Sequence, residues 1–141
     1  MNTTRKSSPV QIGALTTWAE IGTMAQGGVV VVKTDGTLWS WGSNYRGQGG
    51  RSTGGGGSNT SSPIQVGALT DWYSVSGNSS ECNNVAAIKT DGTLWMWGRN
   101  ARGGCGINTS VETSSPVQVG SETDWSWTAT SQGGASFGVR S

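Results

Sequence analysis

The side chains in this sequence that could perform chemistry are few and scattered. There is no histidine, so the commonest general base and metal ligand is missing. The carboxylates lie in predicted turns, before recurring tryptophans, or singly: Asp35, Asp91, Asp71, Asp124, Glu20, Glu81, Glu112 and Glu122. We therefore predict no catalytic residue, no metal site and no cofactor, and expect the chain not to be an enzyme.

The two cysteines and the glycine-rich runs also suggest no reactive site. No secretory signal is recognisable after Met1, so both thiols are expected to be reduced. Cys105 is interpreted as a small buried hydrophobic side chain, whereas Cys82 lies in a predicted loop and could be exposed. The runs at 47–50 and 54–57 lack the Lys-Ser/Thr pair and the strand–loop–helix setting of a phosphate-binding loop.

Tryptophan is the residue that stands out, with eight copies. Four of them alternate in a stretch that occurs twice, at 33–42 and 89–98, with nine of ten positions identical. Each copy carries an Asp-Gly pair before a Leu-Trp-x-Trp run, which predicts a strand, a tight turn and a second strand. The repeated residues are Asp35, Gly36, Trp39, Trp41, Asp91, Gly92, Trp95 and Trp97. Their alternation favours packing between sheets over stacking on sugars or bases.

A second marker, Ser-Ser-Pro followed by an alternating apolar run, begins at residues 7, 61 and 114. A tryptophan follows each proline by nine positions, as Trp18, Trp72 and Trp125. The chain is therefore a single repeat domain, 1–141, with units of approximately 7–60, 61–113 and 114–141. The third unit reaches Arg140, the equivalent of Lys33, so we expect it to stop just before its hairpin turn.

Four strands are predicted in the second unit, at 63–67, 72–76, 85–90 and 93–98. The last of them is apolar on both faces, which predicts a sheet sandwiched between neighbouring sheets. The loops at 42–62 and 98–115 are interpreted as surface connections between one blade and the next.

These residues resemble the regulator-of-chromosome-condensation repeat family, in the short form common in bacteria and their phages. The similarity rests on Ser-Ser-Pro-Val-Gln-Val-Gly at 114–120, on the tryptophan after it, and on residues 87–103. It implies a β-propeller with four-stranded blades, usually seven in a ring. The family's usual Gly-Gln-Leu-Gly is here Gly-Gln-Gly-Gly at 47–50 and Gly-Gly-Cys-Gly at 103–106, and the family's frequent histidine is missing.

The predicted fold is therefore all-β, a partial β-propeller of about two and three-quarter blades, whereas complete propellers have about four to eight. We expect oligomerisation, or a larger protein complex, to cover the open ends. The interface candidates are Pro9, Val10, Ile12, Trp127, Phe137, Val139 and Arg140. Trp127 is singled out because it lies outside the hairpin motif.

Composition limits the classes of partner that we expect. Net charge is +1 with scattered charges, so no nucleic-acid partner is expected. No apolar run approaches the roughly 20 residues that span a bilayer, so no membrane association is expected either. The partners are then expected to be proteins.

Three function classes are compatible with the sequence. The favoured one is a non-enzymatic structural module that assembles with itself or a larger complex, such as a capsid decoration, tail or fibre part of a tailed-phage virion. Its location would be the virion or the cytoplasm. The alternatives are a lectin-like propeller, which would need tryptophans or Tyr45 and Tyr73 exposed on one rim, and a guanine-nucleotide-exchange or chromatin-binding regulator.

Overall fold

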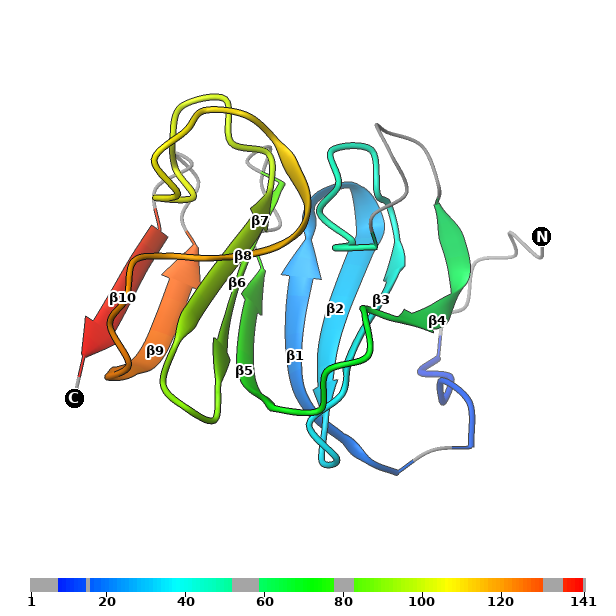
Figure 1. Cartoon of the computed structure of the whole chain (residues 1–141). Coiled ribbons are helices and arrows are strands. Elements are labelled where there is room, and N and C mark those ends of the chain that lie inside the picture. Colours follow the sequence, from blue (N-terminus) through cyan, green and yellow to red (C-terminus); the bar gives the residue numbers. More distant parts are fainter. Residues whose placement is uncertain (1–7, 15, 52–58, 78–82, 131–135, 141) are drawn as a thin grey trace.

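The computed structural model describes the chain except for residues 1–7, 15, 52–58, 78–82, 131–135 and 141. Its described part contains ten strands in two four-stranded antiparallel sheets and one two-stranded sheet, which stand side by side (Figure 1). We call them the first, second and third blades. This arrangement confirms the predicted all-β, partial-propeller fold.

The blades follow one another in chain order. The first comprises β1 (Trp18–Met24), β2 (Gly28–Lys33), β3 (Leu38–Gly42) and β4 (Thr60–Gln65), with the short 3-10 helix η1 (Ala25–Gly27) between β1 and β2. The second comprises β5 (Trp72–Gly77), β6 (Asn84–Lys89), β7 (Leu94–Gly98) and β8 (Thr113–Gln118). The third comprises β9 (Trp125–Thr130) and β10 (Ser136–Arg140).

Both predicted hairpin turns are confirmed. Gly36 and Gly92 have φ angles of 76° and 77°, a region in which glycine avoids steric strain. Each turn also contacts the next blade, because the carbonyl of Gly36 accepts from the amide of Trp72 at 3.1 Å and that of Gly92 accepts from Trp125 at 3.1 Å. A side chain at Gly92 would collide with the carbonyl oxygen of Thr123. The repeated glycine therefore serves both the turn and the contact between blades.

The sequence units are offset from the blades by one strand. β4 and β8, which contain the second and third Ser-Ser-Pro markers, pair with β3 and β7 of the preceding hairpin. The loops at 42–62 and 98–115, predicted to join blades, are therefore connections within a blade, and that prediction is wrong. Residues 66–71 and 119–124 join the blades instead. Pro63 and Pro116 fit here because these strands lie at the sheet edge, where a missing amide leaves the ladder intact.

The first Ser-Ser-Pro marker forms no strand in its described part. Pro9, Val10 and Ile12 are exposed and lie outside the sheets. The other two copies pair with a hairpin that precedes them, and the described chain provides no such hairpin before residue 18. This accounts for ten strands where about eleven were expected.

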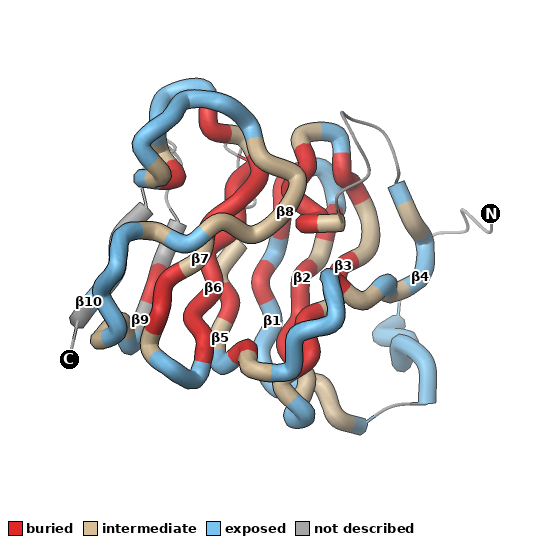
Figure 2. The backbone as a smooth tube through the Cα atoms, viewed as in Figure 1, coloured by how far each residue is buried: buried red, intermediate tan, exposed pale blue. Residues whose placement is uncertain are grey.

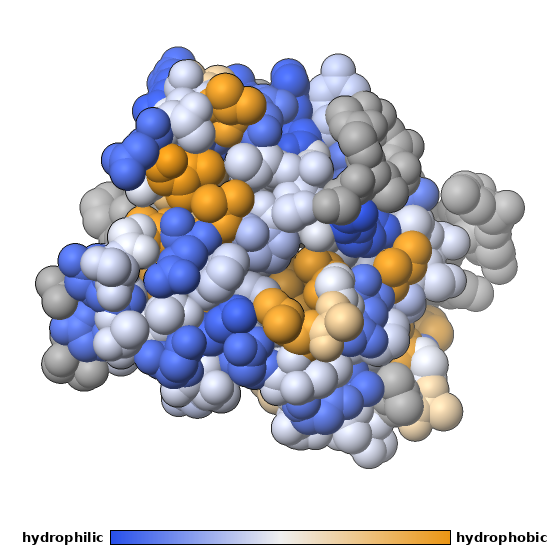
Figure 3. Space-filling view, viewed as in Figure 1, coloured by the Kyte–Doolittle hydropathy of each residue, from blue (hydrophilic) through white to orange (hydrophobic). Residues whose placement is uncertain are grey.

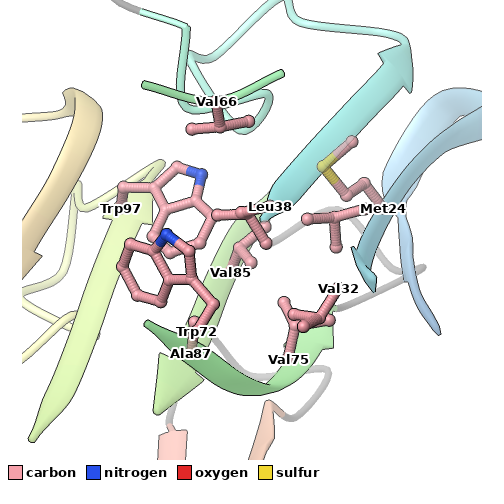
Figure 4. Packing of buried hydrophobic residues seen from close by; sticks show 10 residues of the cluster. Met24, Val32, Leu38, Val66, Trp72, Val75, Val85, Ala87 and Trp97 are labelled. Carbon is pink, nitrogen blue, oxygen red and sulfur yellow. The ribbon is translucent and has the colours of Figure 1, made fainter. Parts of the chain in front are cut away.

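The core lies between the blades. Val32 and Leu38 of the first blade face Trp72 and Trp97 of the second (Figure 4). Val30 belongs to the same cluster. On its other side the second blade buries a second cluster, which Trp125 of the third blade covers in part. Buried residues accordingly concentrate in β2, β6 and β7 (Figure 2). The prediction that the second blade is sandwiched between neighbours is confirmed.

We predict that Gly92→Ala destabilises the chain by about 3 kcal/mol, since it combines a left-handed backbone with a collision against Thr123. Gly103→Ala is the matched control, because Gly103 has a φ of 70° but nothing within 4 Å of the added methyl group. It should cost only about 1 kcal/mol. Urea unfolding measures both, and equal losses would show that the turn does not pack against the next blade.

Candidate functional site: an open tryptophan face

The repeated Asp-Gly-Thr-Leu-Trp motif forms a hydrogen-bonded chain in each blade. In the second blade Asp91 accepts from the amide and hydroxyl of Thr93, at 3.0 and 2.7 Å. The Thr93 hydroxyl in turn accepts from the indole N–H of Trp95 at 2.8 Å. Asp35, Thr37 and Trp39 repeat this arrangement at 3.0, 2.6 and 2.8 Å. The hydroxyl and amide of the threonine lower the pKa of each aspartate, so both carboxylates are engaged in structure.

A lysine lies over the same tryptophans. The ammonium group of Lys89 is 4.5 Å from the ring centre of Trp95 and 5.2 Å from that of Trp72. It also pairs with Asp71 at 3.2 Å. Trp72 meets Trp95 edge to face, with ring centres 6.0 Å apart. Asp71 and Lys89 thus orient the indoles.

The two complete blades join through a tryptophan and a glutamine. The indole N–H of Trp97 donates to the carbonyl oxygen of Gln48 in the first blade at 2.8 Å. The Gln48 side chain is fully buried and reaches Ser43 and Asn83, each at 3.3 Å. In the sequence, this loop was considered as a phosphate-binding run and as a departure from a family pattern, and Gln48 was not predicted to join the blades. The available signal was an amide side chain enclosed by three glycines, at a position where the second unit has Gly104.

One face of the first blade carries the same aromatic pattern but has no described blade against it. The strand register places Ile21 beside Val31 and Trp39, and Val29 beside Trp41. Trp18 packs over both indoles, with ring centres 6.4 Å from Trp39 and 5.9 Å from Trp41. We call this surface the open tryptophan face, comprising Trp18, Ile21, Val29, Val31, Trp39 and Trp41.

The second blade shows what such a face is built for. Its equivalent rows, Val75–Ala87–Trp95 and Val85–Trp97, pack against the first blade. Val75 is 5% exposed, whereas Ile21 in the same row of the first blade is 68% exposed. Val85 and Trp97 are fully buried, whereas Val29 and Trp41 are half-buried. The open tryptophan face therefore has the composition of an interface between blades, with no described blade against it. Within it Ile21 is exposed, the tryptophans and Val29 are half-buried, and Val31 is buried.

The predicted interface residues lie at both ends of the array. Pro9, Val10 and Ile12 are exposed and belong to no strand, and Val139 is exposed in β10. Trp127 lies opposite Val139 in the β9–β10 register, and Phe137 and Arg140 also lie in β10. The side chains of Trp127, Phe137 and Arg140 fall outside the described residues. No described strand pairs with the outer edge of β10. The role of all these residues as an interface stays a prediction.

The thiol predicted to be buried is buried. Cys105 has no exposed surface, and burial raises the pKa of its thiol to about 11. Cys82 lies outside the described residues. Across the described part of the chain, no three His, Cys, Asp or Glu residues gather in a way that could hold a metal ion. No helix in that part is long and apolar enough to cross a membrane.

The two exposed tyrosines do not share a rim. Tyr45 follows β3 and Tyr73 is the second residue of β5. The end of β3 and the start of β5 lie at opposite ends of the blades (Figure 1). This is not the placement that a lectin-like rim requires.

Two segments of the chain match family models described as the regulator of chromosome condensation (RCC1) repeat, at residues 29–48 and 91–136. No curated protein sequence matches the chain. Among solved structures, human WBSCR16 is similar over 85% of this chain and 30% of its own, with 19% identity and a TM-score of 0.69.

Two yeast structures are also similar. Prp20p from Saccharomyces cerevisiae matches 92% of this chain and 33% of its own, with 16% identity and a TM-score of 0.66. Yeast RCC1 (Prp20) bound to Kap60 matches 95% and 32%, with 16% identity and a TM-score of 0.70. The chain spans about a third of the length of these structures. At such identities the likeness shows the fold, a segment of an RCC1-type β-propeller.

We predict that Thr93→Val costs about 1–2 kcal/mol of folding stability, because the substitution keeps the shape but leaves the Trp95 N–H without its acceptor. Urea unfolding measures the loss. Thr123→Val, at an exposed threonine outside the motif, is the control and should change little.

The acid side of the stability curve checks the same contact independently. Hydrogen bonds from Thr93 hold the pKa of Asp91 below its ordinary 3.8, so the stabilisation is present above that pH and disappears as pH falls further. The Thr93→Val chain should therefore lose less stability on acidification than the wild type. Parallel curves would contradict the assigned contact.

Trp97→Phe and Trp41→Phe form a matched pair at equivalent repeat positions. Trp97→Phe should cost about 2–3 kcal/mol, because it removes buried volume and the bond to Gln48. Trp41→Phe, on the open face, should cost less than about 1 kcal/mol. Chemical unfolding of the two variants at a concentration where the chain is monomeric makes the comparison. Similar losses would mean that the two positions are not distinguished by a covering blade.

Proposed function

Because the chain belongs to the regulator of chromosome condensation (RCC1) repeat family, we propose that it is a non-enzymatic protein-interaction module whose open tryptophan face packs against another blade of the same kind. The observation that supports this is the contrast between Ile21 and Val75. They occupy the same row of successive blades, yet one is exposed and the other is buried against its neighbour.

The contact between the first two blades is the template for the proposed interface. There, apolar side chains interlock with the aromatic face and a main-chain carbonyl accepts from Trp97. In a blade that covers the open tryptophan face, the side chains equivalent to Val30, Val32 and Leu38 would pack against Trp39. A main-chain carbonyl of that blade would accept from the indole N–H of Trp41. Burying a side chain such as Ile21 contributes about 1.5–3 kcal/mol, so several such contacts favour association.

We propose that the covering blade comes from a second copy of this chain. The second blade already presents such a surface toward the third, with Ala86, Ile88, Leu94 and Met96 buried beneath Trp125. A head-to-tail contact of this kind is heterologous and closes into a ring where the rotation allows. The outer edge of β10, with which no described strand pairs and where Val139 is exposed, offers further strand pairing at the other end.

Protein partners also agree with what is described for the similar structures. Prp20p is described as binding Gsp1p and histones, and yeast RCC1 (Prp20) is seen bound to Kap60. These partners belong to those proteins, and what we carry over is the class of partner. The net charge of +1 gives no reason to propose nucleic acid.

We also propose a location for the module, the virion of a tailed phage. The cytoplasm is the alternative location. The virion proposal rests on the resemblance of the repeats to short bacterial and phage forms. Mass spectrometry of purified particles tests it, and absence of the chain from particles made by its own source would contradict it.

We predict that the wild-type chain elutes as a discrete oligomer and that Ile21→Arg reduces it to a monomer with an unchanged far-ultraviolet spectrum. Ile21 is largely exposed, so the charge should leave the blade folded while preventing burial of the face. Val111→Arg is the matched control, because Val111 is 67% exposed and lies away from the open tryptophan face. Light scattering on a sizing column gives the masses.

Two outcomes would contradict the proposal. One is an Ile21→Arg oligomer of unchanged mass, and the other is a wild-type chain that stays monomeric at every concentration tested.

A further inference from the structure

A cleft of about 440 Å³ opens between the outer strands of the first and second blades, and Trp72 and Trp95, whose packing is described above, are among its lining residues. Ile64, Val66 and Leu69 form one side of it, and Trp95 and Pro116 belong to the other. Figure 3 shows hydrophobic atoms gathered on this face, over the end of β4 and the connection that follows it. The size lies within the range of about 300–1,000 Å³ typical of small-molecule sites.

Arg51 is the one charged residue among the described lining residues. Its Nη1 donates to the hydroxyl of Thr60 at 2.7 Å, which holds the guanidinium group in the wall of the cleft. The guanidinium group of Arg51 is partly removed from water, and this burial lowers its pKa. The group nevertheless remains charged. A cation in such surroundings attracts an anion more strongly than one in bulk water does.

The repeat itself marks Arg51 as unusual. The second unit has Ile107 at the equivalent position, one residue after the glycine pattern of 103–106. Ile107 packs against the buried cluster of the second blade, as a purely structural residue would. The fold therefore accepts an aliphatic side chain here, and the guanidinium group of the first blade is a departure that packing does not require.

We propose that this cleft binds a small aromatic carboxylate, with its ring against Trp95 and the apolar wall and its carboxylate at Arg51. A guanidinium group matches a carboxylate in bidentate geometry. A single cation in an apolar cleft suits one negative charge better than the two of a phosphate monoester. The site is independent of the open tryptophan face, since the two surfaces share no residue.

Indole-3-acetate is the probe, and its uncharged match is indole-3-acetamide. We expect indole-3-acetate to shift the indole N–H resonance of Trp95 in a nuclear magnetic resonance titration, with a Kd of the order of 1 mM. The amide should bind roughly tenfold more weakly or worse, because it lacks the charge that Arg51 would meet. Equal binding of acid and amide would overturn the proposal.

Arg51→Ile is the decisive variant, because it installs the residue that the second unit already uses at this position. It should keep the fold, seen as a spectrum whose resonances away from the cleft are unchanged, and weaken indole-3-acetate binding roughly tenfold or more. Undiminished binding by this folded variant would also overturn the proposal.

A second pair of variants tests whether the ligand occupies the cleft, independently of any substitution at Arg51. Leu69→Glu adds a negative charge at an exposed position in the cleft and should weaken binding of the acid but not of the amide. Val111→Glu adds the same charge away from the cleft and should leave both unchanged. If Leu69→Glu binds the acid as the wild type does, the ligand does not occupy this cleft, and the proposal fails. Failure here would leave the proposed function untouched, since oligomer mass is measured without ligand.

Discussion

The structure depends on the burial of tryptophan between successive sheets. A four-stranded blade with two apolar faces cannot satisfy both of them alone, and Trp97 reaches full burial because the first blade lies against it. The same constraint determines how far the residues of the other strands are buried. Strands with neighbours on both sides, such as β6, are buried throughout, whereas β1 is buried only at Gly22 and Met24.

Much of the blade could be predicted because its signals are local. The turn at Asp91-Gly92 needs only a positive φ angle and a short chain of hydrogen bonds to Thr93 and Trp95, all within five residues. Such contacts appear directly as a repeated motif. The alternation of Leu94, Trp95, Met96 and Trp97 likewise follows from the strand period and predicted the two buried faces.

What could not be predicted is non-local. The pairing of β4 with β3 joins residues of different sequence units, and nothing in Ser-Ser-Pro says which hairpin it completes. The bond from Trp97 to Gln48 spans 49 positions, and the cleft combines residues from Gly50 to Pro116. Each of these features depends on how one blade packs against the next, which local propensity does not specify.

Comparison of the two complete blades separates what builds a blade from what distinguishes it. The identical positions, from Lys33 to Gly42 and from Lys89 to Gly98 with one exception, serve the turn and the aromatic face. The exception is informative. Ser40 donates to the carbonyl of Gly49 at 2.7 Å, while its counterpart Met96 lies in the apolar cluster beneath Trp125.

The same division applies to the loop that follows. Gln48 and Arg51 stand where the second unit has Gly104 and Ile107. One fills the joint between blades with buried hydrogen bonds, and the other places a cation in an apolar cleft. Repeated residues thus supply a common scaffold, and the residues that break the repeat give each junction its own polarity. In a chain built from similar repeats, the positions that differ between the repeats are the ones at which specific binding can arise.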